Sequence, residues 1–74
     1  MDLRTGMLWF DDARDRSLTE KIARAVAYYQ AKYGQAPNTC YVPPSASADD
    51  ATISGVCVKS APNILPGHLW LGVA

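Results

Sequence analysis

Residues 17–34 read SLTEKIARAVAYYQAKYG, and this stretch predicts the helix around which the rest of the chain is organised. Ser17 followed three residues later by Glu20 is the pattern of a capping box at a helix N-terminus. Gly34 is placed for a left-handed C-cap, and Pro37 prevents the helix from restarting. Apolar side chains recur at helical spacing and form one stripe for burial: Leu18, Ile22, Ala25, Val26, Tyr29 and Tyr33.

The segments on either side of this helix have the composition of β-strands. Four strands are predicted, over residues 3–10, 39–42, 53–58 and 68–73. The order β-α-β-β-β predicts one α+β domain over residues 1–74, a mixed sheet of about four strands with the amphipathic helix on one face. The strand–helix–strand order favours parallel first and second strands, either adjacent or separated by another strand. Residues 45–52, SASADDAT, predict a flexible loop.

Details of the strands indicate how their faces are used. The apolar run MLWF at residues 7–10 is expected where both faces of a strand are at least partly covered. Gly55 marks a bulge or a close approach within residues 53–58. In residues 68–73, Leu69, Leu71 and Val73 alternate with His68 and Trp70, which predicts one buried face and one polar or aromatic face.

One helix covers only one face of such a sheet. The other face would then carry some of a set of aromatic and polar side chains: Trp9, Tyr41, Cys57, His68 and Trp70. Because aromatic residues are enriched in interface cores, an interface is predicted there, formed by Trp9, Tyr41, His68 and Trp70. The alternative is that loops and the N-terminal segment cover this face within one chain.

Composition and charge narrow the classes of function. The chain has 74 residues, of which 49% are hydrophobic, so it is too apolar for a disordered segment. A domain this small has a high surface-to-volume ratio, which favours a homo-oligomer, a dimer above all, or binding to another protein. Seven basic and seven acidic residues give a formal net charge of zero, which disfavours nucleic acid as a partner.

Targeting signals and cysteine usage point to a cytoplasmic protein. The first residues, MDLRTGMLWFDD, do not have the pattern of a signal peptide, and no run approaches the length of a membrane-spanning helix. Cys40 and Cys57 lack the close spacing of a zinc motif. Two small buried thiols are the simplest interpretation, with a disulfide as the alternative if the two strands lie close together.

One pair of carboxylates raises an alternative function. Asp11 and Asp12 follow an apolar strand and precede the helix, a position where many α/β proteins hold magnesium and a phosphoryl group. Lys59 and Ser54 would then steady the phosphate. The competing interpretation is that these carboxylates solubilise a loop and interact favourably with the helix dipole.

The remaining candidate for chemistry is His68, the only histidine of the chain. A catalytic histidine needs an orienting carboxylate and a nucleophile, and pairing with Cys40 or Cys57 would leave little room for a substrate cleft. We therefore predict a non-enzymatic protein without a cofactor, acting as a protein–protein interaction or assembly module. The helix tyrosines are assigned to core or interface packing rather than to base stacking.

A family resemblance offers one more alternative. The stretches YGQAPNTCYVPP and ISGVCVKSAPNILPGHLWLG resemble segments of tailed-phage major capsid proteins, in which a helix leads to a strand ending in proline, a Gly-Val-x-Val strand and a Pro-Gly turn. The resemblance covers about half the chain and rests on common strand and turn residues. It carries over no functional residue and implies a structural or accessory protein of a phage or mobile element.

Overall fold

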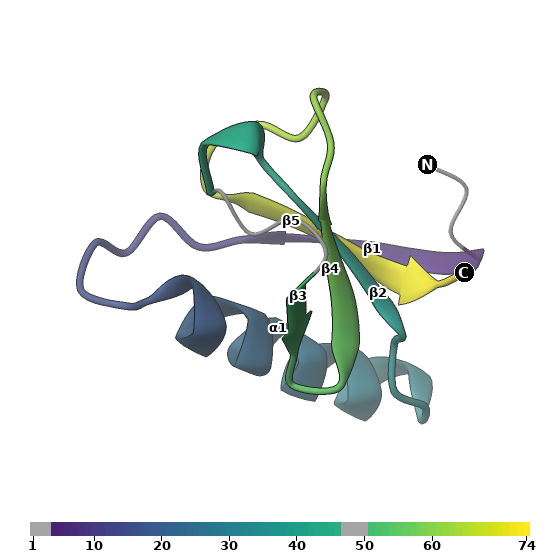
Figure 1. Ribbon diagram of the computed structural model, residues 1–74. Helices are drawn as coiled ribbons and strands as arrows, with labels where there is room; N and C mark the ends of the chain where they lie inside the picture. The colour runs from purple at the N-terminus through teal and green to yellow at the C-terminus, as the bar shows by residue number, and fades with distance from the viewer. Residues whose placement is uncertain (1–3, 47–50) are drawn as a thin grey trace.

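The computed structural model describes residues 4–46 and 51–74, and it confirms the predicted α+β class (Figure 1). The elements in chain order are β1 (Arg4–Phe10), α1 (Leu18–Tyr33), β2 (Thr39–Val42), the short 3₁₀ helix η1 (Pro44–Ala46), β3 (Ala51–Ile53), β4 (Val56–Ser60) and β5 (His68–Val73). The sheet has five strands rather than the predicted four. The additional strand is β3.

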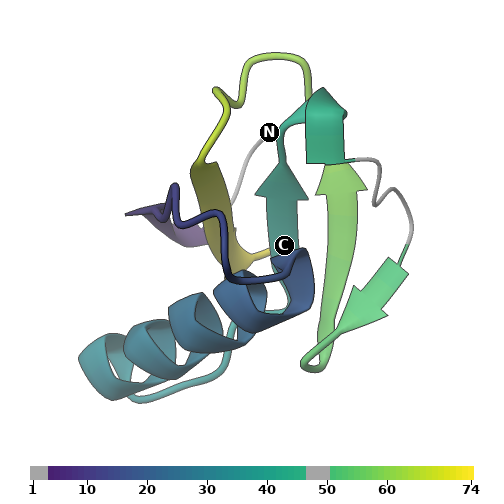
Figure 2. The same ribbon diagram turned by 90° about the vertical axis from the view of Figure 1, so that its left-hand side faces the viewer.

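The sheet is mixed, as predicted, and its strand order is β1-β5-β2-β4-β3. Strands β2 and β4 are parallel, whereas β5 is antiparallel to both β1 and β2, and β3 is antiparallel to β4. The first two strands therefore run in the same direction with β5 between them, one of the two arrangements expected. Figure 2 shows β1 at one margin of the sheet, β3 at the other, and α1 lying across one face.

Local signals at both ends of α1 act as the sequence predicts. The Ser17 side chain accepts a hydrogen bond from the Glu20 backbone N–H at 3.2 Å, and the Glu20 carboxylate accepts one from the Ser17 N–H at 3.4 Å. Gly34 adopts a left-handed conformation with φ 74°, and its N–H donates to the Gln30 carbonyl. A residue with a Cβ is strained in that conformation, so glycine ends the helix here.

The third predicted strand, residues 53–58, is wrong as a single element. Ser54 and Gly55 both have positive φ, at 52° and 79°, and form a two-residue hairpin turn between β3 and β4. Positive φ at both central residues is the geometry of the turn type that matches the twist of antiparallel strands. Gly55 therefore marks a reversal of the chain and not a bulge. The predicted loop 45–52 includes the last two residues of η1 and the start of β3, and its residues 47–50 lie outside the described residues.

The hydrophobic core fills the space between α1 and one face of the sheet. Ile22, Ala25 and Tyr29 supply the helix side, as the stripe predicts. Six buried side chains supply most of the sheet side: Met7, Cys40, Val42, Val56, Val58 and Leu71. Because the paired residues of neighbouring strands share a face, the registers Met7–Leu71 and Cys40–Val58 align these side chains toward α1.

A hydrogen bond joins the helix to the irregular start of β1. The register of β1 on β5 shifts between Arg4 and Met7, and Thr5 within this bulge has φ 52°. The hydroxyl of Tyr29, which is fully buried, donates to the Thr5 carbonyl at 2.6 Å. Burial also raises the pKa of the Tyr29 phenol. This contact holds a strained backbone segment against the core.

The helix α1 has only 16 residues, and no helix in the described part of the chain is both long and apolar enough to cross a membrane.

Candidate functional site

The face of the sheet turned away from α1 lacks a covering layer within the described residues, and we call it the open face. Its side chains follow from the strand registers and alternate with the buried ones: Leu8, Phe10, Thr39, Tyr41, Thr52, Cys57, Lys59, His68 and Trp70. Leu8 and Phe10 are each 58% exposed, which is high for large apolar side chains on a central surface of a sheet. The open face is therefore the principal candidate site.

Trp70 forms the centre of the open face. It lies opposite Leu8 on one neighbouring strand and opposite Tyr41 on the other. Its ring lies against Gly6, where a Cβ would collide with the indole. A glycine in β1 thus makes room for an aromatic ring of the adjacent strand, which covers the glycine in return. Trp70 is half-buried in this position and remains accessible from outside.

One end of the open face carries a second aromatic pair. The rings of Phe10 and His68 lie 4.8 Å apart between centroids, and their residues are directly opposite in the β1–β5 register. The His68 Nδ1 also lies 3.1 Å from the Pro66 carbonyl, in the turn that leads into β5. In that turn, Gly67 has φ 81° and the His68 N–H donates to the Leu65 carbonyl, the geometry expected of a Pro-Gly turn.

Three of the four predicted interface residues lie together on the open face: Tyr41, His68 and Trp70. Trp9 lies on the other face. Its ring is 5.0 Å from that of Tyr28 on α1, and it packs against the core. Leu8 and Phe10 were not predicted to belong to this face, because the run MLWF contains no polar residue to show which side faces outward. The outward side of the run is only partly covered, since Leu8 and Phe10 are each 58% exposed.

An apolar groove extends the open face beyond the strands. It has a volume of about 150 Å³ and is lined by Leu8, Asn63, Ile64, Leu65 and His68. Leu65 is 66% exposed, the largest exposed fraction among the big hydrophobic side chains of the described residues. The segment between β4 and β5 therefore adds apolar surface at the same end as the Phe10–His68 pair.

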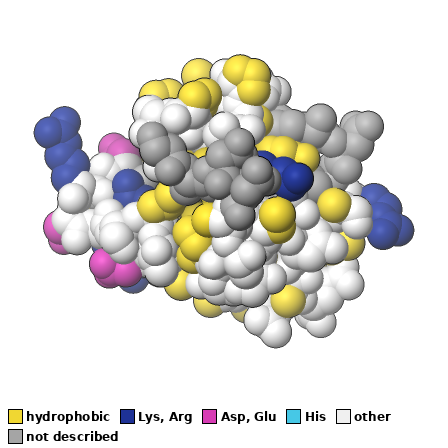
Figure 3. Space-filling view, viewed as in Figure 1, with side chains coloured by type: hydrophobic (Ala, Val, Ile, Leu, Met, Phe, Trp, Pro, Cys, Tyr) yellow, Lys and Arg dark blue, Asp and Glu magenta, His cyan; other side chains and the backbone are white. Residues whose placement is uncertain are grey.

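The predicted acidic site has a different arrangement. Asp11 is buried, and both of its carboxylate oxygens are occupied by Arg16, whose Nε lies 3.0 Å from Oδ2 and Nη2 3.1 Å from Oδ1. Oδ1 also accepts a hydrogen bond from the Ala13 N–H at 3.0 Å. These bonds shape the tight connection between β1 and α1. Figure 3 shows acidic side chains gathered at this end of the molecule, next to basic ones.

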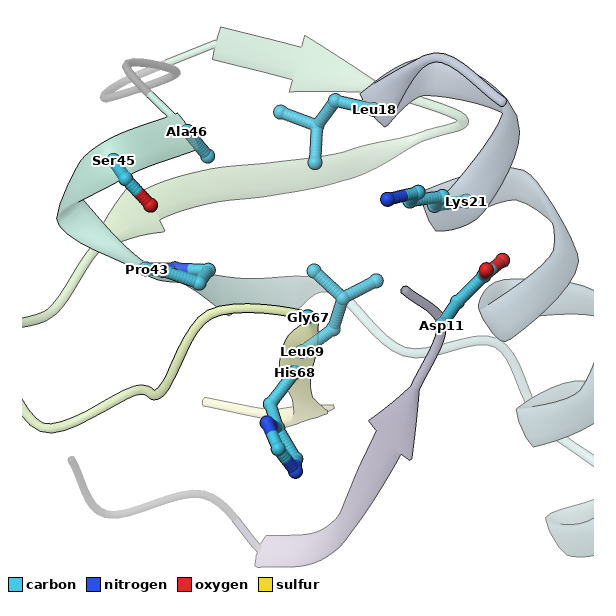
Figure 4. Close-up of a pocket in the computed structure, with 9 residues that line it drawn as sticks. All are labelled: Asp11, Leu18, Lys21, Pro43, Ser45, Ala46, Gly67, His68 and Leu69. Carbon is cyan, nitrogen blue, oxygen red and sulfur yellow. The ribbon is translucent and has the colours of Figure 1, made fainter. Parts of the chain in front are cut away.

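A pocket of about 240 Å³ lies beside this connection, at the carboxyl ends of β1 and β2 (Figure 4). Lys21 directs its ammonium group into the pocket, whereas the Asp11 carboxylate turns toward α1 and the His68 ring points away. Ser45 and Ala46 of η1 line the opposite side. Among the described residues that line this pocket, Lys21 is the one lysine or arginine, so the pocket is suited at most to a small anion.

The residues expected to complete a magnesium–phosphoryl site do not gather there. Asp12, Ser54 and Lys59 are not among the residues that line the pocket. Within residues 4–46 and 51–74, no three His, Cys, Asp or Glu side chains are close enough to hold a metal ion. Because both carboxylate oxygens of Asp11 bond to Arg16, the geometry favours a structural role for this carboxylate over metal binding. The acidic site therefore stays a hypothesis from the sequence.

The Asp11–Arg16 pair predicts a specific dependence of stability on pH. Hydrogen bonding to Arg16 and to the Ala13 N–H lowers the pKa of Asp11 below its ordinary value of 3.8. Because the folded pKa is below the unfolded one, the pair stabilises the fold above about pH 4 and loses this effect as the pH falls further. Urea unfolding measured from about pH 7 to about pH 2.5 should show a smaller loss of stability for Asp11→Asn than for the wild type.

Asp12→Asn is the matched control for this experiment. Its side chain is exposed and neighbours the same loop, so at a concentration where the chain is monomeric the variant should follow the pH dependence of the wild type. Equal pH dependence of Asp11→Asn and the wild type would contradict the role assigned to the ion pair.

The two cysteines are free and lie on opposite faces of the sheet. Cys40 is buried against α1, and burial raises its pKa to about 12. Cys57 is half-buried on the open face, opposite Thr39 and Thr52. Cys40 and Cys57 lie on adjacent strands, but their side chains point to opposite faces of the sheet. The two residues therefore do not form the disulfide that was considered as an alternative.

Comparison with known proteins found no relative of this chain: no family model, no curated protein and no solved structure matches it. The resemblance to capsid-protein segments therefore stays a hypothesis from the sequence. The open face is the structural feature that supports a proposal for the function.

Proposed function

We propose that this protein is a non-enzymatic assembly module that self-associates by packing the open faces of two copies against each other. The observation that carries the proposal is the pair Leu8 and Phe10, each 58% exposed beside Trp70 on a sheet face without a covering layer in the described residues. Aromatic and large apolar side chains gathered on one surface are typical of interface cores.

The size of the surface is consistent with a dimer that includes the groove. A standard interface buries about 800 Å² of each partner, which is about a fifth of the 4378 Å² that this chain exposes. Five strands about 4.8 Å apart and about five residues long span roughly 400 Å² of flat sheet. The accessible surface of such a face exceeds its flat projection because side chains protrude from it, and the neighbouring segment that carries Leu65 adds further apolar surface.

Charge also permits two copies to approach. The formal net charge is zero, so long-range repulsion between copies is weak. Lys59 is the one charged residue of the open face as defined, and it lies on β4 opposite Tyr41, two strands away from Trp70. The part of the face formed by β1 and β5 is thus free of charged residues, as in the core of most protein interfaces.

The test is solution mass by size-exclusion chromatography with light scattering over a range of concentrations. The wild type should have at least twice the 8.0 kDa mass of one chain at high concentration. Trp70→Ser removes the central ring and should weaken face-to-face association by about 30-fold or more, the effect of losing a hot-spot residue.

Tyr28→Ser is the control, because Tyr28 is an aromatic residue 52% exposed on α1 and not on the open face. It should leave the concentration dependence of the mass unchanged. A wild-type chain that stays monomeric at every concentration would overturn the proposal. The open face would then be available for a different protein, and a search for that partner would follow.

A further inference from the structure

The free edge of β1 is a second surface that can bind, because its backbone N–H and C=O groups are available to another strand. Among residues 4–46 and 51–74, strand β1 pairs with β5 on one side only and stands at the end of the sheet order (Figure 2). Such an edge presents a row of unpaired backbone N–H and C=O groups, which natural sheets usually protect with charges, proline or a very short strand. The opposite edge, β3, is protected by its length of three residues.

The register shows which backbone groups of β1 face outward. The Asp11 N–H donates to the Gly67 carbonyl at 2.8 Å, so Asp11 and Gly67 form a hydrogen-bonded pair that continues the Phe10–His68 register. In an antiparallel ladder, hydrogen-bonded pairs alternate with non-hydrogen-bonded pairs. The backbone groups of Met7 and Trp9 therefore point toward β5, and those of Leu8 and Phe10 point to the free edge.

The usual protection is missing along this part of β1. Residues 6–10 read GMLWF and contain neither a charge nor a proline. Leu8 and Phe10 combine outward backbone groups with side chains that are each 58% exposed. The bulge near Thr5 disturbs only the first part of the strand.

The ends of β1 carry opposite charges. Exposed Arg4 begins the strand, and exposed Asp12 lies just beyond its end. When two identical strands pair antiparallel about a two-fold axis, the beginning of each lies beside the end of the other. When the two-fold axis passes beside Leu8, so that Leu8 lies opposite Leu8 of the second copy, Arg4 of one copy lies near Asp12 of the other, twice per dimer. The edge is therefore self-complementary in charge as well as in hydrogen bonding.

We propose that two copies of this chain pair antiparallel along their β1 edges, with the two Leu8 residues exchanging backbone hydrogen bonds across the two-fold axis, to form one continuous ten-stranded sheet. This contact is separate from packing of the open faces, and both are symmetric. A chain that uses both surfaces assembles beyond a dimer, whereas a chain that has lost one of them stops at a dimer.

Amide hydrogen exchange by NMR tests the edge directly. As the concentration of the protein is raised, the Leu8 and Phe10 amides should slow by about tenfold or more, since they become hydrogen-bonded only in the paired form. The Met7 and Trp9 amides serve as internal controls, because they are bonded to β5 in every form. Fast exchange of Leu8 and Phe10 at all concentrations would overturn the inference.

Two variants separate the edge from the open face. Leu8→Pro removes an outward N–H that β5 does not use, so it should keep the fold and abolish edge pairing. Leu8→Thr also removes the apolar side chain but keeps the N–H, and it should retain edge pairing. Equal loss of mass in both variants would assign the effect to the side chain and overturn the inference.

Combining these variants with Trp70→Ser makes failure of either surface distinguishable. Trp70→Ser alone, and Trp70→Ser combined with Leu8→Thr, should stop at an edge-paired dimer, whereas Trp70→Ser combined with Leu8→Pro should be monomeric. Both Leu8 changes remove the same apolar side chain from the open face, so equal masses of the two double variants would overturn edge pairing. As a test of register, Arg4→Glu and Asp12→Arg should each weaken the edge contact, and the two changes together should restore it.

Discussion

Tyr29→Ala should lower the free energy of unfolding by about 3–5 kcal/mol, the range found when a large buried aromatic side chain is truncated to alanine. Tyr29 is fully buried, packs against Tyr33 with ring centroids 4.6 Å apart, and belongs to the core between α1 and the sheet. A chain of 74 residues has a total stability of roughly 4–11 kcal/mol. The variant should therefore lose between about a quarter and all of that stability.

Tyr29→Phe isolates the contribution of the hydroxyl group. It keeps the ring but removes the donor to the Thr5 carbonyl, so the free energy of unfolding should fall by about 1–2 kcal/mol. Urea unfolding followed by tryptophan fluorescence measures both variants. Tyr28→Phe is the control, since Tyr28 is half-exposed on the same helix and should change stability by less than about 0.5 kcal/mol. Equal effects of Tyr29→Phe and Tyr28→Phe would contradict a structural role for the hydrogen bond.

Leu71→Ala should lower the free energy of unfolding by about 2–5 kcal/mol. Leu71 is fully buried in β5 and lies opposite Met7 on one side and Cys40 on the other. Both neighbours belong to paired strands of the same sheet, so the structure around the lost side chain has little freedom to collapse into the cavity. The cost should therefore lie toward the upper part of that range.

Leu65→Ala makes the same chemical change at a side chain that is 66% exposed. Measured at a concentration where the chain is monomeric, it should change stability by less than about 0.5 kcal/mol. A loss for Leu71→Ala no larger than that for Leu65→Ala would show that β5 does not lie at the centre of the core. Comparison of the two variants thus tests the strand order as well as the burial of one residue.

The sequence predicted most closely those elements whose signals are local. The capping residues Ser17 and Gly34 lie where the structure has them, and β2 and β5 have the predicted bounds of 39–42 and 68–73. In β5, alternation of apolar and polar side chains correctly separated the buried face from the open one. Local backbone geometry and a period of two or 3.6 residues determine these features, so a short window of sequence contains them.

The errors arose where a local pattern admits two structures. The dipeptide Ser54-Gly55 is compatible with a bulge or with a hairpin turn. It forms a hairpin turn because β3 and β4 pair with each other on either side of it. The apolar run at residues 7–10 shows no alternation, so only its pairing with β5 decides that Trp9 faces α1 while Leu8 and Phe10 face outward. For the same reason, the sequence could name an aromatic face but not all of its members.

Asp11 illustrates the corresponding limit for the candidate sites. Its position after a strand and before a helix was evident from the sequence, but its partner was not. Arg16 reaches it because the connection folds back through the Asp11–Ala13 hydrogen bond, and the pair then occupies both carboxylate oxygens. Such an outcome depends on the path of a loop in space, which neither spacing nor composition specifies.

By itself, the sequence determined the helix with both of its caps, the α+β class, and a sheet of which one helix covers only one face. Those properties depend on neighbours within a few residues and on composition. Only the tertiary structure decided that β5 lies between β1 and β2, that β1 forms a free edge, and that Leu8 and Phe10 are exposed beside Trp70. The reason is physical: strand order and register are set by side-chain packing between residues far apart in the chain.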